Sequence, residues 1–198
     1  MSSHHFVKEK QEPALFIHSE QSLNLELLGQ LLEWSPYVIA DEHVLYCLNH
    51  EPIKLDLVIQ QHLSDEEMEA WTANQADLSI LKLSSTENKL MAVVQYLEKE
   101  QHQALSLLAC NDEHVQNLDK LSTNIDIIQY AENYKGYFMK HDFKKWKARN
   151  AVFEIFDDPI ETKNLIFCHH NTWKVVSDGL VEINLNRKTY IKEYSLDN

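Results

Sequence analysis

Glycine is the residue that this chain most clearly lacks. Only three of its 198 residues are glycine, Gly29, Gly136 and Gly179, whereas an average usage of about 7% would give roughly 14. Glycine allows a backbone to approach a phosphate group closely and to turn with a positive φ angle. The sequence therefore argues against a glycine-rich loop of the kind that holds the phosphates of a nucleotide.

Cysteine is also scarce. The three cysteines, Cys47, Cys110 and Cys168, are odd in number, lie far apart and form no CxxC pair. This spacing argues against a disulfide framework and against a zinc site built on thiolates. Each cysteine lies beside apolar neighbours, so we expect three buried free thiols.

Positive charge and long apolar runs are lacking as well. The chain has 18 Lys and Arg against 31 Asp and Glu, a formal net charge of -13. Such a surface repels phosphate backbones and anionic lipids, so we expect no nucleic-acid partner and no membrane partner. No run approaches the roughly 20 apolar residues that cross a bilayer, and the polar leader, residues 1–13, lacks the apolar centre of a signal peptide. We therefore expect a cytoplasmic location.

What the chain does contain is an alternation of short apolar runs and helical stripes. The runs that predict buried strands are Ala14–Ile17, Tyr37–Ala40, Leu55–Ile59, Leu78–Leu83 and Ala104–Cys110. Strands that alternate with helices predict an α/β domain over residues 14–145, with a parallel-rich sheet flanked by helices. Ligands of such folds bind beyond the carboxyl ends of the strands, so the informative residues should follow the strands.

Two capping boxes predict where helices begin. Ser64 with Glu67, and Ser84 with Glu87, have the spacing at which each side chain bonds the other residue's backbone N–H. The acidic run that starts at Asp65 can be interpreted as a metal cluster. Acids in the first turn of a helix are stabilised by its dipole, so we interpret the run as capping instead.

Beyond residue 145 the pattern changes to period two, without helical stripes. The alternating runs are Ala151–Phe156, Asn164–Cys168, Gly179–Leu185 and Thr189–Tyr194, and Ile125–Tyr130 and Gly136–Met139 precede them as further strands. This predicts a small antiparallel β domain over residues 146–198. We interpret the basic stretch 140–149 as a solvated linker whose Phe143 and Trp146 dock into the core. Binding of phosphate and a stacked base is the alternative.

Two sets of histidines are candidate ligand sites. Cys168, His169 and His170 are adjacent, but neighbours on a strand point to opposite faces, so we expect no metal there. The second set would form a cationic pocket if the strand ends brought its members together: His43, His62, Lys89 and His114. We expect these histidines to be scattered surface residues instead.

The order of these segments resembles the thiamine pyrophosphokinase family along most of the chain. The most specific stretches are HHFVKEKQEPAL at residues 4–15 and LGQLLEWSPYV at residues 28–38, which are similar to one bacterial subgroup. Residues 53–59 resemble the family's third strand, and residues 181–194 resemble its closing hairpin. The resemblance implies a nucleotide-binding α/β domain followed by a thiamine-binding β domain, in a dimer that transfers pyrophosphate from ATP to thiamine with Mg2+.

The chain departs from the family where the family's chemistry lies. The motif G-D-x-D-S reads QQHLS at residues 60–64, D-Q-D-x-T-D reads SSTENK at residues 84–89, and a glycine-rich turn ending in R-x-D-H reads NDEHVQN at residues 111–117. The degenerate nucleotide-binding positions are therefore Gln60, Gln61, Ser84, Thr86, Asn111 and Asn117. Asp41, Asp56 and Ser64 still match the family, and its thiamine-contacting Ser-Asn pair corresponds to Thr172 and Trp173.

These departures predict the loss of catalysis. Mg2+ prefers hard oxygen ligands, and phosphoryl-type transfer depends on positioning and on charge neutralisation by that metal. We therefore expect no metal and no cofactor, and predict an inactive homodimeric relative that binds thiamine or a nucleotide, or that regulates. Two alternatives stay open. One is an active enzyme, using Mg2+ and ATP, whose site is rebuilt on Asp41, Asp56 and Glu87. The other is a heterodimer partner of a true pyrophosphokinase.

Overall fold

The chain divides into two compact units. A computed structural model describes residues 13–49, 51–73, 75, 77–111, 115, 124–139 and 142–194. The units are Met1–Ala109 and Cys110–Asn198, so the division lies earlier than the boundary expected near residue 145. The reason is that β6 (Asp126–Tyr130) pairs with β7 (Tyr134–Met139), and β7 pairs with β14 (Thr189–Tyr194) near the end of the chain.

The first unit contains a parallel sheet, as the alternation of strands and helices predicted. Its strand order is β5-β1-β2-β3-β4, and every adjacent pair is parallel. The strands are β1 (Ala14–Ile17), β2 (Val38–Asp41), β3 (Leu57–Gln60), β4 (Ser79–Lys82) and β5 (Ala104–Leu108). Four of them are almost entirely buried, because both faces of a parallel sheet are covered. The exception is β4, whose Ile80 is 42% exposed.

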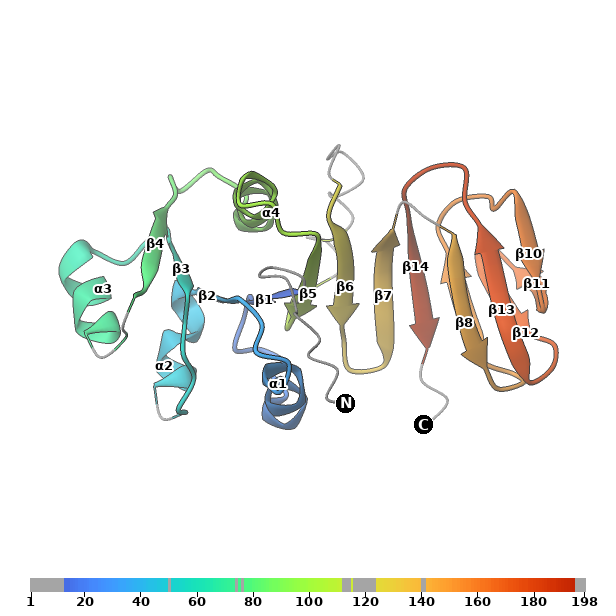
Figure 1. The fold of residues 1–198 in the computed structure, drawn as a ribbon, viewed down its shortest axis with the longest axis horizontal. Helices are drawn as coiled ribbons and strands as arrows, with labels where there is room; N and C mark the ends of the chain where they lie inside the picture. Colours follow the sequence, from blue (N-terminus) through green and yellow to red (C-terminus); the bar gives the residue numbers. More distant parts are fainter. Residues whose placement is uncertain are drawn as a thin grey trace, which may run out of the picture. The chain divides into compact units, whose positions relative to one another are not determined.

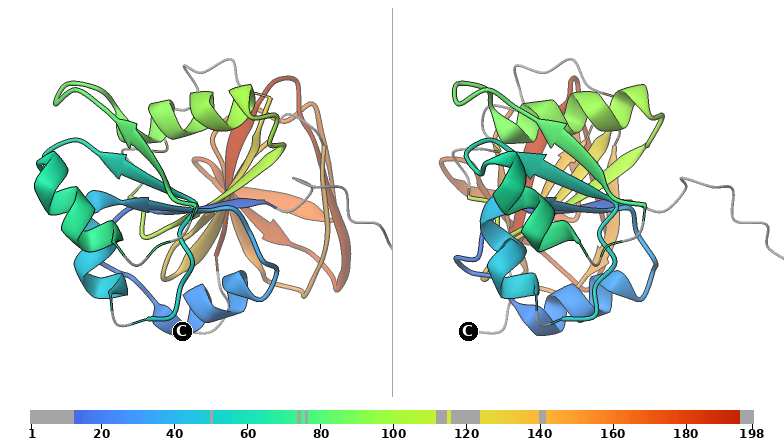
Figure 2. Two further views of the ribbon diagram at one scale, coloured as in Figure 1. Left: turned by 60° about the vertical axis from the view of Figure 1, so that its left-hand side comes forward. Right: turned by 90° about the vertical axis from the view of Figure 1, so that its left-hand side faces the viewer.

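Helices cover the two faces of this sheet. Their bounds are α1 (Leu25–Leu32), a 3-10 helix (Glu42–Val44) that continues into α2 (Leu45–Leu48), α3 (Asp65–Thr72) and α4 (Lys89–Lys99). Figures 1 and 2 show α1 and α4 on opposite sides of the sheet. The face of α4 that was expected to be internal is buried, namely Leu90, Val93, Val94 and Leu97. None of the described helices combines the length and the apolar character that crossing a membrane requires.

One of the two predicted helix starts is confirmed and the other is wrong. Ser64 and Glu67 form a complete capping box at the start of α3. The N-cap of α4 is Asn88, whose side chain accepts from the Met91 backbone N–H, and not Ser84. The Glu87 carboxylate does bond the Ser84 backbone N–H and hydroxyl. Here that bonding closes a separate turn before the helix, because the helical backbone begins only after Asn88.

The second unit contains antiparallel β-structure. One sheet has the order β11-β12-β9-β14-β7-β6 within this unit, and a second sheet has the order β10-β13-β8. The strands not yet bounded are β8 (Phe143–Lys147), β9 (Val152–Ile155), β10 (Glu161–Lys163), β11 (Leu165–His169), β12 (Thr172–Val175) and β13 (Gly179–Asn184). Side chains of both sheets form one core, with Phe153 and Ile191 from the first sheet and Phe143 and Val181 from the second.

Two expectations, one about the basic stretch and one about the cysteines, need correction. The basic stretch expected as a linker contains strand β8, in which Phe143 docks into the core as predicted but Trp146 is 64% exposed. The three cysteines are free, but only Cys110 is buried, while Cys47 is half-buried and Cys168 is exposed on β11. Apolar sequence neighbours did not bury Cys168, because β11 lies at the edge of the sheet formed by the described strands and most of its side chains are exposed.

Candidate functional site

Polar side chains gather at the carboxyl ends of β2 and β3. Asp41 is the last residue of β2 and lies level with Ile59 of β3, so the loops that follow the two strands leave the sheet at the same edge. Glu42 and His43 come from the first loop, and Gln61 and His62 come from the second. This is the edge at which α/β folds bind ligands.

The Asp41 carboxylate is buried and already has partners. The Lys89 ammonium nitrogen, at the start of α4, lies 2.9 Å from Oδ2 and 3.0 Å from Oδ1. The His43 backbone N–H donates to Oδ1 at 3.0 Å, and the His18 imidazole lies 3.6 Å from Oδ2. Burial by itself raises the pKa of Asp41, but His18, the His43 N–H and Lys89 together hold that pKa below its ordinary value. Asp41 is therefore an ionised carboxylate within an internal ion pair.

The Glu42 carboxylate is enclosed by backbone donors. Its Oε2 accepts from the N–H groups of Gln61, His62 and Leu63 at 2.9, 3.0 and 3.0 Å, and its Oε1 accepts from His62 at 2.9 Å. Burial raises the pKa of Glu42, and these backbone N–H groups outweigh that effect and keep the pKa low. Successive N–H groups that converge in this way form an anion-binding nest. The anion that this nest holds is a side chain of the protein itself.

Two glutamines at degenerate family positions make hydrogen bonds at this edge. Gln61 Nε2 donates to the backbone carbonyls of Ser84 and Glu87 at 2.7 and 2.9 Å, which ties the loop after β3 to the loop after β4. Gln60 Nε2 donates to the Leu63 carbonyl at 2.8 Å and to Asp65 Oδ1 at 2.9 Å. The structure thus brings Gln60, Gln61 and Ser84 to one edge, where Gln61 joins two loops through backbone carbonyls and Gln60 bonds a carbonyl and the Asp65 carboxylate.

The acids of the rebuilt-site alternative do not converge. Asp56 precedes β3, and its Oδ2 accepts from the Val38 backbone N–H at 2.8 Å, at the start of β2. It therefore lies at the amino ends of the strands, whereas Asp41 lies at their carboxyl ends. The exposed Glu87 carboxylate is engaged by Ser84. Ser64, the third residue that still matches the family, is the N-cap of α3.

His43 and His62 come together, contrary to the expectation of scattered histidines. Their rings stack with centroids 5.8 Å apart, and His43 Nε2 lies 3.8 Å from Glu42 Oε1. Lys89 lies 3.7 Å from the same Glu42 oxygen. Three members of the predicted cationic set are therefore neighbours, around two carboxylates that the prediction omitted. His114 lies outside the described residues.

The other predicted site residues lie elsewhere. Asn111 is exposed shortly after β5, Thr86 is exposed beside Ser84, and Asn117 falls outside the described residues. Thr172 and Trp173 are half-buried on β12 of the second unit, where the Trp173 ring packs edge-on against Phe167 at 5.3 Å.

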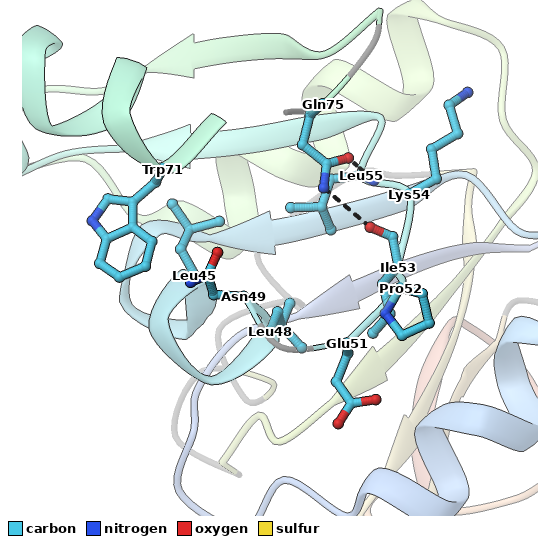
Figure 3. A pocket seen from close by; sticks show the side chains of 10 residues that line it. All are labelled: Leu45, Leu48, Asn49, Glu51, Pro52, Ile53, Lys54, Leu55, Trp71 and Gln75. Carbon is cyan, nitrogen blue, oxygen red and sulfur yellow. Dashed lines mark hydrogen bonds between the residues drawn. The ribbon is translucent and has the colours of Figure 1, made fainter. Parts of the chain in front are cut away.

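A pocket of about 410 Å³ lies at the opposite end of β3 from this edge, beside α2 and α3 (Figure 3). Leu45, Leu48 and Trp71 supply apolar walls. Gln75 fixes the chain before β3, since it accepts from the Leu55 N–H at 3.0 Å and donates to the Ile53 carbonyl at 3.2 Å. No sequence motif predicted this pocket, because its lining comes from three separate segments.

Comparison with known proteins identifies the fold. Neither a protein-family model nor a curated protein matches the sequence. The structure is similar to thiamine pyrophosphokinase from Bacillus subtilis, with a TM-score of 0.65 at 13% identity over 93% of this chain and 100% of that chain. The enzyme from Geobacillus thermodenitrificans gives a TM-score of 0.66 at 10% identity, over 93% of this chain and 99% of that chain. The enzyme from Candida albicans gives a TM-score of 0.63 at 8% identity, over 93% of this chain and 90% of that chain. At these identities the similarity shows the fold, which is thiamine pyrophosphokinase-like.

The described residues do not fit the Mg2+ that the family resemblance implies. Mg2+ takes a near-octahedral set of hard oxygen ligands, chiefly carboxylates and phosphates. The Asp41 oxygens face Lys89, Glu42 Oε2 accepts three backbone N–H groups, and Asp56 lies at the other end of the strands. These carboxylates therefore do not form an oxygen cage for Mg2+.

Proposed function

We propose that this chain is a thiamine pyrophosphokinase-fold protein that does not transfer pyrophosphate and acts by binding, as a homodimer. The observation that carries the proposal is the internal pairing at the carboxyl ends of the strands. There, Lys89 neutralises Asp41, and Glu42 fills the nest of backbone N–H groups. Charges and donors that a metal–nucleotide complex would require are taken up by the protein's own side chains.

The physics of phosphoryl-type transfer supports this proposal. The protein's contribution to such a reaction is almost entirely the positioning of the phosphates and the neutralisation of their charge. The Glu42 carboxylate already occupies the N–H groups of the nest, and its negative charge repels a second anion there. The glutamine at position 61 links two loops by neutral hydrogen bonds, at a position where the family resemblance places an acid. Catalysis would require all of these contacts to be replaced.

The ligand side of the proposal rests on the second unit. The family resemblance places the thiamine contacts at Thr172 and Trp173, and both side chains are half-buried and so retain accessible surface. We assign to them the contact with a thiamine-like ring. An indole offers a large apolar face for such a ring, and a threonine hydroxyl can donate or accept a hydrogen bond.

Two measurements on the full chain test the proposal. Thiamine diphosphate formation is followed by chromatography with ATP, thiamine and Mg2+, and no product above a protein-free control is expected. Thermal shifts are recorded with thiamine, thiamine diphosphate, ATP and AMP, each with and without Mg2+. We expect a thiamine shift that the Trp173→Ala variant loses. A ligand present at a hundred times its dissociation constant stabilises the folded state by about 2.7 kcal/mol, and a thermal scan detects a change of that size. Product formation, or an ATP shift that requires Mg2+, would overturn the proposal.

Exposed apolar side chains of the second unit support a partner surface. On β11, Ile166 and Phe167 are 57% and 53% exposed, and Val176 and Leu180 add further apolar surface at 52% and 45%. Large exposed apolar side chains that gather into a patch mark an interaction site, and we assign the dimer contact to these residues, with Phe167 at its centre. Light scattering of the purified chain should give the mass of a dimer, and Phe167→Glu should shift it towards the monomer. A monomeric mass at all concentrations would contradict the homodimer and favour a heterologous partner for this surface, such as a true pyrophosphokinase.

A further inference from the structure

Three potential metal ligands meet at the carboxyl edge of the parallel sheet. Glu42 and His43 follow β2, and His62 follows β3. One ligand atom of each side chain lies within 4.8 Å of the ligand atoms of the other two. The two loops are level because Asp41 is in register with Ile59, so the sheet itself fixes this proximity.

The carboxylate of this group is fixed and the two imidazoles are free to adjust. The Glu42 side chain is fully buried, and the three N–H groups on Oε2 hold it in place. Its Oε1 accepts one backbone N–H and lies 3.8 Å from His43 Nε2. The His43 side chain is 60% exposed, and His62 is also exposed, so both rings can rotate. The group is thus one rigid oxygen ligand beside two mobile nitrogen ligands.

The distances suit a small divalent ion. Bonds of about 2.0–2.1 Å at tetrahedral angles place neighbouring ligand atoms roughly 3.3–3.5 Å apart. The 3.8 Å between His43 Nε2 and Glu42 Oε1 is within a few tenths of an ångström of that range. The other two separations are at most 4.8 Å, and rotation of the two exposed rings would shorten them without moving the buried carboxylate.

The chemistry of the ligands selects the ion. Imidazole nitrogen suits zinc and its first-row neighbours, whereas Mg2+ and Ca2+ require mostly oxygen. Lys89 does not block the site, since its ammonium lies closer to Asp41, at 2.9 Å, than to Glu42 Oε1, at 3.7 Å. Asp41, Glu42 and Lys89 together carry one net negative charge, which partly balances a divalent cation.

We propose that Glu42, His43 and His62 bind a divalent first-row transition ion, with zinc as the fitting example and a fourth position open to water or an anionic ligand. The site differs from a Mg2+ site in its ligands, and the proposal does not depend on the absence of pyrophosphate transfer.

The test uses Co2+ and Zn2+ with the full-length protein. Co2+ should give visible absorption typical of a tetrahedral nitrogen and oxygen site, without the thiolate charge-transfer band that Cys168 would produce. Calorimetry with Zn2+ should reveal a site whose affinity falls at least about tenfold in His62→Ala and in His43→Ala. Millimolar Mg2+ should not compete.

The matched control is the His169→Ala/His170→Ala double variant, which removes a second pair of neighbouring histidines whose ring centroids lie 5.8 Å apart. It should leave this affinity unchanged. Circular dichroism and a thermal melt without metal establish that each variant folds. Zinc affinity that is unchanged in the His43→Ala/His62→Ala double variant would overturn the proposal, as would the absence of stoichiometric binding.

Discussion

The Lys89 ammonium lies 2.9 Å from an Asp41 carboxylate oxygen, and the two side chains are only 11% and 1% exposed. The residues are 48 positions apart in the chain, and they join the carboxyl end of β2 to the start of α4. In the family that the sequence resembles, the position of Lys89 carries an acid. In this chain the cation at this position forms a buried ion pair with Asp41.

Removal of Lys89 should strongly destabilise the first unit. Lys89→Met leaves the buried Asp41 carboxylate without its main cationic partner, and the loss of one member of a buried pair typically reduces the free energy of unfolding by about 3–5 kcal/mol. Urea denaturation followed by circular dichroism measures the change. The double variant Asp41→Asn/Lys89→Met should recover much of it, because no buried charge is then left unpaired.

Lys82→Met is the matched control for this prediction. Lys82 pairs with Asp65 at 2.6 Å, but the two side chains are 60% and 72% exposed. Exposed pairs contribute about 0–1 kcal/mol. If Lys89→Met destabilised no more than Lys82→Met, the Asp41–Lys89 pair would not be the structural element described above.

The start of α4 gives a second prediction. The Asn88 side chain accepts from the Met91 N–H at 3.0 Å, so Asn88→Ala should lower the free energy of unfolding by about 1 kcal/mol. Ser84→Ala removes only bonds within an exposed turn before the helix and should have a smaller effect. Thermal unfolding of the two variants side by side measures the difference. A larger effect of Ser84→Ala than of Asn88→Ala would indicate that Ser84, and not Asn88, caps the helix.

The sequence predicts the elements that have strong periodicity. The runs at Ala14–Ile17 and Thr189–Tyr194 match β1 and β14 residue for residue, because continuous or alternating apolar patterns directly reflect burial. The strands β8, β10 and β12 were missed since they are short, polar or both. The second capping box failed because the same Ser-x-x-Glu bonding also stabilises an isolated turn.

The candidate site was less predictable because its contacts are made between distant segments. His43 and His62 meet only because β2 and β3 pair in the register Asp41 with Ile59, and no local pattern encodes that register. Glu42 follows a predicted strand, where informative residues were expected, but no ligand role was predicted for it. The available signal was an Asp-Glu pair directly after a buried strand, where two adjacent carboxylates cannot both enter the protein without donors.

The glycines allow a third prediction, with an internal control. A Cβ atom at position 136 would lie 2.7 Å from ring carbons of Tyr190, a buried side chain whose hydroxyl donates to Gln129 Oε1. Gly136→Ala should therefore lower the free energy of unfolding by about 1–3 kcal/mol. Gly29 lies exposed inside α1 with no atom within 4 Å of such a Cβ, so Gly29→Ala should stabilise by up to about 1 kcal/mol. Equal effects of the two substitutions would contradict the packing of β7 against Tyr190.

The last prediction concerns pH and the second unit. The Glu193 carboxylate on β14 contacts the ammonium groups of Lys145 and Lys147 and accepts from the Tyr137 hydroxyl at 2.9 Å. Burial by itself raises the pKa of Glu193, but Lys147, Lys145 and Tyr137 hold that pKa below its ordinary value. A carboxyl group whose pKa is lower in the folded state makes its full contribution to protein stability when the pH is above its unfolded-state pKa of about 4.3. That stabilisation is lost as the pH falls through the folded value.

Glu193→Gln should therefore destabilise at pH 7 and matter less in acid. At pH 7 it leaves two partly buried ammonium groups without their anion, a loss of about 1–3 kcal/mol in the free energy of unfolding. As the pH falls below the unfolded pKa of about 4.3 and through the lower folded pKa, the wild-type protein loses the contribution of Glu193, so the two stability curves should converge. Denaturation at a series of pH values measures both curves. Glu182→Gln is the control, since Glu182 pairs with the more exposed Lys144 and Lys163 and should change the pH dependence less. Parallel curves for wild type and Glu193→Gln would show that the folded and unfolded states bind the Glu193 proton equally, and that the three contacts do not stabilise the carboxylate.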